Sequence, residues 1–223
     1  MPHPERPQDL VASSYDVIAE RYAAWTGEVL TGARARYVTL VQEQITPGAA
    51  VLDLGCGTGV PVSRALAAQY RVTGLDGSAY SIELARQNVP EATFRRADMT
   101  QVAFAPESFA AVISCYAIIH VPRAEHAALL RHIAGWLQPG GLLIATMGAT
   151  ESEGTEEDWL GAPMYWSHFD AETNQRLVTN AGLAMMEAVL DSADEDGQPI
   201  THQSTTALAT NGLLHEYVVA AMR

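Results

Sequence analysis

The strongest chemical signal in this sequence is a glycine-rich turn directly after a short apolar stretch. Residues 50–54 (Ala-Val-Leu-Asp-Leu) form a run of the kind found in a buried parallel strand. Three glycines follow, at Gly55, Gly57 and Gly59. Glycine lets the backbone turn tightly and approach a ligand with no Cβ in the way, and the helix expected next offers free N–H groups. The turn therefore predicts a ligand-binding site at the end of the strand.

Two acidic residues narrow the kind of ligand. Asp76 ends the next expected strand, 21 positions after Gly55, where an acid can accept hydrogen bonds from both ribose hydroxyls of an adenosine-containing cofactor. Asp98 follows the third expected strand, in position to accept the exocyclic amine of adenine while Met99 packs on the ring. The glycine spacing departs from the dinucleotide fingerprint G-x-G-x-x-G/A, because Val60 stands where glycine or alanine is needed.

Two histidines are the candidate general bases. His120 follows the fourth expected strand and His168 follows the fifth. Both are therefore expected at the carboxyl edge of the sheet, where ligands bind in such folds. A base there would remove a proton from an attacking nucleophile. For each histidine, bracing the loop that carries it is the open alternative.

Residues 159–169 are rich in aromatic side chains and are expected at the same edge. Four aromatics, a methionine and a histidine in eleven residues suit the wall of an apolar pocket, and aromatic faces suit a cationic ligand. We therefore expect a substrate pocket lined by Tyr116, Met164, Tyr165 and Trp166. The alternative is a hydrophobic cluster that only anchors an inserted loop.

The order of the elements predicts an α/β fold. Strands and helices alternate with short joins from residue 50 to 148, which indicates a parallel sheet with right-handed crossovers. Helices are expected at 9–25, 28–45, 62–70, 79–88, 124–137 and 171–181, and strands at 50–54, 71–75, 93–95, 110–115, 142–147, 183–190 and 216–222. Two acidic segments, 151–158 and 191–199, are expected to be a solvated loop and a turn.

The composition indicates how many domains the chain forms and which partners it is expected to bind. A chain of 223 residues, 48% hydrophobic, suits one domain. We divide it into N-terminal helices (1–45), a ligand-binding core (46–148), a substrate-pocket insertion with its helix (149–182) and C-terminal strands (183–223). A net charge of -13 repels phosphate backbones and anionic lipid, so neither nucleic acid nor a membrane is an expected partner. Two cysteines and no signal-like start predict a cytoplasmic location.

Five motifs in sequence order resemble the class I S-adenosylmethionine-dependent methyltransferases, and more narrowly their bacterial small-molecule group. They are DLGCGTG (53–59), GLDGS (74–78), ADM (97–99), PESFAAVI (106–113) and LQPGGLL (137–143). The resemblance covers roughly residues 13–148 and implies a doubly wound, mostly parallel seven-stranded Rossmann-like sheet. Its implied strand order is 3-2-1-4-5-7-6, with strand 7 antiparallel and helices on both faces. The implied activity is methyl transfer from S-adenosylmethionine to an oxygen, nitrogen or carbon atom of a small molecule.

The resemblance also implies the cofactor contacts. From the methionine end to the adenine they are Asp53, Gly55, Cys56, Gly57, Gly59, Cys115, Asp76, Gly77, Ser78, Asp98 and Met99. Cys115 and Tyr116 would lie beneath the sulfonium. Tyr15 and Tyr22 lie in a segment that is similar to the helix that closes over the cofactor in this group, and core packing is their alternative role.

Other functions remain open at this point. No metal is expected, because the sequence has no His/Cys cluster at zinc spacing and carries Ser-Cys-Tyr at 114–116, where catechol-type enzymes place acidic metal ligands. A Rossmann oxidoreductase that binds NAD(P), a regulatory protein that binds the cofactor without turnover, and an aminopropyl transferase on a related fold are the alternatives.

Overall fold

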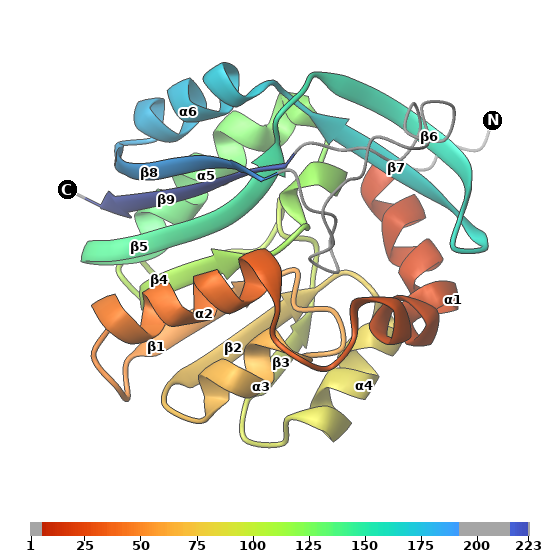
Figure 1. Cartoon of the computed structure of the whole chain (residues 1–223), viewed down its shortest axis with the longest axis horizontal. Coiled ribbons are helices and arrows are strands. Elements are labelled where there is room, and N and C mark those ends of the chain that lie inside the picture. The colour runs from red at the N-terminus through yellow and green to blue at the C-terminus, as the bar shows by residue number, and fades with distance from the viewer. Residues whose placement is uncertain (1–5, 192–214, 223) are drawn as a thin grey trace.

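Apolar runs in the first two thirds of the chain form the centre of a seven-stranded sheet (Figure 1). The computed structural model describes residues 6–191 and 215–222. Its strands are β1 (Ala50–Leu54), β2 (Arg71–Asp76), β3 (Thr93–Arg96), β4 (Phe109–Ser114), β5 (Leu137–Gly148), β6 (Ser152–Trp159), β7 (Ala162–His168), β8 (Leu183–Asp191) and β9 (His215–Met222). Its helices are α1 (Pro7–Thr26), α2 (Gly32–Gln44), α3 (Val62–Ala67), α4 (Ala79–Asn88), α5 (Arg123–Trp136) and α6 (Ala171–Asn180), with a 3₁₀ turn, η1, at Ile118–His120.

The strand order of the main sheet is β3-β2-β1-β4-β5-β9-β8. Strands β1 to β5 pair in parallel, and β9 runs antiparallel to both β5 and β8. Because β8 and β9 are the sixth and seventh strands of this sheet, the predicted order 3-2-1-4-5-7-6 with an antiparallel seventh strand is confirmed.

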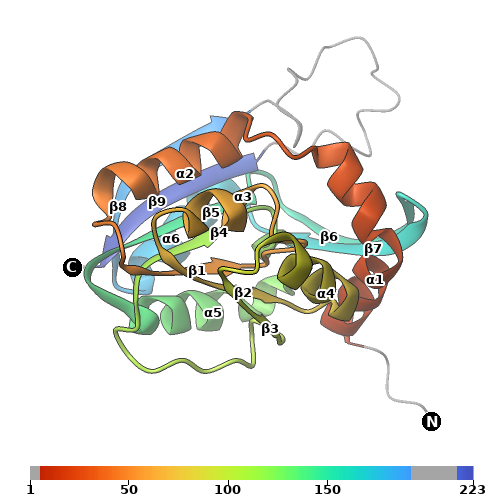
Figure 2. The same ribbon diagram turned by 90° about the horizontal axis from the view of Figure 1, so that it is seen from below.

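Helices cover both faces of the sheet (Figure 2). Helices α2 and α3 pack on one face through side chains such as Tyr37 and Leu66, and α5 and α6 pack on the other through Leu130 and Val178. These four side chains are fully buried, and burying one large apolar side chain stabilises a fold by about 1.5–3 kcal/mol. Because helices cover both faces of the sheet, the central strands consist of continuous runs of apolar residues.

Helix α1 lies outside these layers and crosses the carboxyl edge of the parallel strands (Figure 2). Hydrogen bonds from two neighbouring residues of α1 attach this helix to the rest of the protein. The hydroxyl of Ser14 donates to the carbonyl of Pro163 in β7 (2.5 Å), and Asp16 accepts from the hydroxyl of Ser78 (2.6 Å) and the backbone N–H of Tyr80 (2.9 Å). None of the described helices is both long and apolar enough to cross a membrane.

The expected loop at 151–158 is wrong, because this segment is strand β6. It pairs with β7 in a separate two-stranded antiparallel sheet, in which Thr155 faces Tyr165 and Glu156 faces Met164 (Figure 1). The strand exposes most of its side chains, so it shows none of the apolar alternation that marks a half-buried strand. The expected acidic turn at 191–199 lies, apart from Asp191 at the end of β8, outside the described residues.

Candidate functional site

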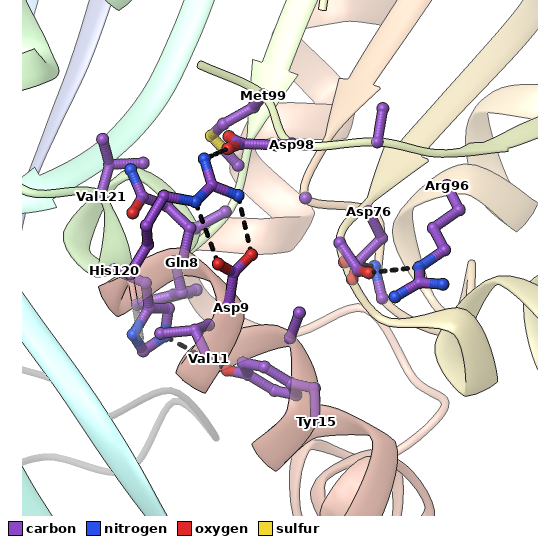
Figure 3. A pocket seen from close by; sticks show the side chains of 18 of the residues that line it. Gln8, Asp9, Val11, Tyr15, Asp76, Arg96, Asp98, Met99, His120 and Val121 are labelled. Carbon is purple, nitrogen blue, oxygen red and sulfur yellow. Dashed lines mark hydrogen bonds and ion pairs between the residues drawn. The ribbon is translucent and has the colours of Figure 1, made fainter. Parts of the chain in front are cut away.

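A cavity of about 340 Å³ lies at the carboxyl edge of the parallel strands, between helix α1 and the loops that follow β1 to β4 (Figure 3). Among the predicted site residues, those that line it are Tyr15, Tyr22, Gly55, Gly57, Asp76, Gly77, Asp98, Met99, Cys115, Tyr116 and His120. One cavity therefore collects residues from five separate segments of the chain.

The glycine turn forms the floor of this cavity. Gly55 has a φ of 83°, and a Cβ built on it would lie 2.2 Å from the Cβ of Ala117, so only glycine fits. At Gly57 the φ is 52° and a Cβ would meet no atom within 4 Å. Gly57 thus presents bare backbone toward open space, as a ligand cradle requires. Gly59 does not line this cavity, and a Cβ built on it would meet Phe94 and Val89, so its cofactor contact stays a prediction.

Asp76 is half-buried at the end of β2, and its carboxylate organises the turn. One oxygen accepts from the backbone N–H of Gly57 and the other from the backbone N–H of Ser78, both at 2.9 Å. Burial raises the pKa of this carboxyl, while these two bonds oppose the rise. Ser78 itself lies outside the cavity and caps helix α4 by accepting from the N–H of Ser81 (2.9 Å). Its predicted cofactor contact is corrected to a structural one.

Asp98 and Met99 lie at the far end of the cavity, in the loop after β3 (Figure 3). One carboxylate oxygen of Asp98 accepts from the N–H and the hydroxyl of Thr100, both at 2.8 Å. The other oxygen lies 3.0 Å from the guanidinium of Arg6, at the start of α1. Sequence reasoning missed this arginine, because it lies in a stretch with three prolines (residues 1–8) that suggests a loose tail.

A second, smaller cavity of about 50 Å³ adjoins the first and shares Tyr22, Gly55, Gly57 and Cys115 with it. Two further predicted residues, Asp53 and Cys56, line only this one. The hydroxyl of Ser63 donates to Asp53 at 2.5 Å. Burial raises the pKa of Asp53 to about 7, against the lowering effect of Ser63 and, more weakly, of Arg34.

Arg34 is a functional candidate that sequence reasoning missed. Its side chain comes from α2, is buried, and lines the small cavity. The guanidinium donates to the hydroxyl of Tyr22 (2.9 Å) and lies 4.6 Å from the centre of the Tyr116 ring. An arginine in a helix normally lies on the solvent face, so nothing in the local pattern marked this one.

His120 and Tyr15 meet at the opposite end of the main cavity (Figure 3). The Nδ1 atom of His120 lies 2.8 Å from the carbonyl oxygen of Tyr165, and its Nε2 atom lies 3.2 Å from the hydroxyl of Tyr15. A carbonyl oxygen only accepts, so Nδ1 carries the proton and Nε2 keeps its lone pair. Burial lowers the pKa of His120 to about 4, which makes the ring neutral at pH 7.

The other candidate base, His168, lies outside the cavity. Its ring is buried against Gly148, and Nδ1 is bonded to the carbonyl of Thr150 (2.5 Å). The expectation that it faces the cavity is therefore wrong. The reason is the unforeseen strand β7, which turns this side chain toward the end of β5 instead of toward the ligand edge.

The expected pocket residues of the same strand are also displaced from the cavity wall. Met164 is fully buried against Ile18 of α1, and the Tyr165 hydroxyl donates to Glu153 (2.8 Å). The centre of the Trp166 ring lies 4.5 Å from that of the His120 ring, and Trp166 does not line the cavity. Met164 and Trp166 pack on α1 and His120, and the backbone carbonyl of Tyr165 contacts His120. Of the predicted four, Tyr116 alone lines the cavity. In the part of the chain that the structure describes, no cluster of three His, Cys, Asp or Glu residues is arranged to hold a metal ion.

The sheet order and the position of this cavity define a Rossmann-like class whose ligand lies at the carboxyl edge of the sheet. Residues 51–141 match the sequence family described as a methyltransferase domain. This match and the relatives below support the resemblance to the class I S-adenosylmethionine-dependent methyltransferases. S-adenosylmethionine is the cofactor of this family.

Relatives and solved structures agree with this assignment. The chain is 31% identical over 137 residues to a trans-aconitate 2-methyltransferase of Azoarcus sp. (strain BH72), covering 60% of this chain and 53% of that one. It is 31% identical over 140 residues to a demethylmenaquinone methyltransferase of Renibacterium salmoninarum, covering 61% and 57%. The chain thus spans little more than half the length of these relatives. The fold is similar to that of Haemonchus contortus phosphoethanolamine N-methyltransferase 2, solved with phosphomonomethylethanolamine and S-adenosylhomocysteine (TM-score 0.73, 16% identity, 100% of this chain and 61% of that one).

Proposed function

We propose that this protein transfers a methyl group from S-adenosylmethionine to a small-molecule acceptor. One observation carries the proposal: a single cavity joins an adenosine-type end, with Asp76, Asp98 and Met99, to an end where Tyr15 and His120 meet. A donor and an acceptor held at the two ends would react in line, and such alignment is the main task of a methyltransferase.

The residues of the cavity fit the cofactor. Carboxylate oxygens have more than one acceptor position, so Asp76 can receive ribose hydroxyls while it holds Gly57 and Ser78. The open backbone at Gly57 and the cation of Arg34 in the adjoining small cavity suit the amino-acid end, whose carboxylate is an anion. When bound, the cofactor supplies an electrophilic methyl group on a positively charged sulfonium.

Aromatic side chains surround the end at which methyl transfer would occur. Tyr15, Tyr22 and Tyr116 line the cavity, and the rings of Tyr15 and Tyr22 are 5.5 Å apart in an edge-to-face arrangement. Trp159 of the β6–β7 hairpin lies 5.7 Å from Tyr22 and 6.1 Å from Tyr15. Aromatic faces stabilise a nearby cation, and they exclude water from it. Trp159 does not line the cavity, so the hairpin supports the tyrosines of the cavity wall from outside.

His120 is the proposed base. Its Nδ1–H is fixed by the carbonyl of Tyr165, so Nε2 is the atom that takes a proton from the acceptor, either directly or through the hydroxyl of Tyr15. A pKa of about 4 keeps Nε2 free at neutral pH but makes it a weak base. The acceptor should therefore be a good nucleophile already, such as an amine or an acidic hydroxyl, that needs only a late proton transfer.

A small acceptor follows from size and charge. A cavity of about 340 Å³ is at the small end of the range for ligand pockets, and the net charge of -13 opposes binding to nucleic acid. Supporting this, two relatives are methyltransferases named for the small molecules trans-aconitate and demethylmenaquinone. The direct test is incubation with S-adenosylmethionine that carries an isotopically labelled methyl group, together with panels of small amines and acidic hydroxyl compounds. We expect a labelled product by mass spectrometry. A protein that binds S-adenosylhomocysteine yet labels no acceptor would instead be a cofactor-binding protein without turnover.

A further inference from the structure

Arg6 joins helix α1 to the adenine end of the cavity, where it contacts Asp98. Its Nη1 atom lies 3.0 Å from Oδ2 of Asp98. Its Nε and Nη2 atoms donate to the two carboxylate oxygens of Asp9, at 3.0 and 2.7 Å. One guanidinium therefore bridges an acid of its own helix and an acid of the loop after β3.

This contact occupies the carboxylate that the adenine amine is expected to use. Thr100 already donates twice to Oδ1 of Asp98, which leaves Oδ2 as the oxygen available on the cavity side. In this structure Arg6 takes that oxygen, and Arg6 itself lines the cavity. Because Arg6 lines the cavity and already donates to Oδ2, its guanidinium takes the space through which the adenine amine would approach this oxygen.

We propose that Arg6 competes with the cofactor for Asp98, and that binding of adenine displaces the guanidinium from Oδ2. This inference rests on the proposed function. Arg6 keeps its two bonds to Asp9, whose pKa it lowers, so the displaced cation stays paired. Helix α1 keeps its other attachments at Ser14 and Asp16, so the exchange is local to the first turn of the helix.

The competition has a distinctive dependence on salt. The side chain of Arg6 is 51% exposed, and ion pairs this exposed are weakened by salt. S-adenosylhomocysteine has no net charge at neutral pH, so its own attraction to the protein changes little with salt. Weakening the Arg6–Asp98 pair should therefore strengthen its binding, which is opposite to the usual effect of salt on a charged ligand.

The test is calorimetric titration of S-adenosylhomocysteine into the full chain, its Arg6→Gln variant and the control Arg176→Gln. Arg176 pairs with Glu172 on the exposed face of α6, away from the cavity. At low salt we expect Arg6→Gln to bind about two- to fivefold more tightly than the unmodified chain, the range open to an exposed ion pair. At high salt the difference should shrink, and Arg176→Gln should match the unmodified chain throughout.

A second pair of variants locates the effect. In an Asp98→Asn background, Arg6→Gln should no longer tighten binding, because the competing ion pair is already absent. Equal or weaker binding by Arg6→Gln alone, or tighter binding that persists beside Asp98→Asn, would overturn the competition. Failure of the unmodified chain to bind S-adenosylhomocysteine at all would count against the proposed function instead.

Discussion

Replacing His120 with asparagine distinguishes the roles of its two ring nitrogen atoms. The asparagine amide can still donate to the carbonyl of Tyr165, but it has no counterpart of Nε2 and does not titrate. Burial lowers the pKa of His120 from its ordinary 6.5 to about 4, so the folded protein holds this ring in its neutral form. The substitution should therefore change how the free energy of unfolding depends on pH.

The sign follows from proton uptake. Between pH 6.5 and pH 4 the unfolded chain binds a proton at His120 and the folded protein does not, so lowering the pH favours unfolding. The stabilising contribution is present above pH 6.5 and is lost as the pH falls toward 4. With 1.36 kcal/mol for each pKa unit, this residue alone removes about 2 kcal/mol of unfolding free energy between pH 7 and pH 5.

The assay is urea unfolding at pH 7 and pH 5, followed by circular dichroism, for the unmodified chain and for His120→Asn. Buried His126 and His168, whose pKa values are also lowered by burial, and Asp53 are common to both proteins and cancel in the comparison. The unmodified chain should lose about 2 kcal/mol more than the variant on acidification. His132→Asn, the same change at an exposed position, is the control. Equal losses in the unmodified chain and His120→Asn would refute the buried neutral imidazole.

Three further predictions concern the ligand site. Asp76→Ala should weaken S-adenosylhomocysteine binding by about 1.5–3 kcal/mol, which is what hydrogen bonds to a charged group contribute. Unchanged affinity in a folded variant would mean that another acidic residue binds the ribose hydroxyls. Arg34→Gln should weaken S-adenosylhomocysteine binding about tenfold, because it removes the buried cation. The control Arg36→Gln alters an exposed arginine of the same helix, paired with Glu187, and should leave the affinity unchanged. Equal effects of the two variants would show that Arg34 is not part of the site. His120→Asn should lower turnover roughly 10²–10⁴-fold with little change in cofactor affinity, while His168→Asn should mainly lower stability; the reverse pattern would exchange their roles.

The parallel core could be predicted from the sequence because its signals are local. The run before Gly55 is apolar since both faces of β1 are covered, and Asp76 stands at the next strand end, so their spacing alone placed them at one edge. The order of all seven strands came from the family resemblance, and the structure agrees with it.

The hairpin and its consequences could not be predicted in the same way. Strand β6 is mostly exposed and acidic, so its extended form depends on pairing with β7 and not on its own pattern. Once β7 is a strand, alternate side chains point in opposite directions, which carries His168 away from the cavity. Sequence reasoning missed Arg6 and Arg34 for a related reason: each is brought to the site by a contact with a residue far along the chain, Arg6 with Asp98 and Arg34 with Tyr116.

We propose above all that the cavity at the edge of the sheet binds S-adenosylmethionine. The most direct measurement is calorimetric titration of the full chain with S-adenosylmethionine, with S-adenosylhomocysteine and with NAD at neutral pH. We expect the first two to bind with dissociation constants on the order of micromolar, and we expect NAD neither to bind nor to compete. Tight binding of NAD with no heat from S-adenosylhomocysteine would contradict the proposal.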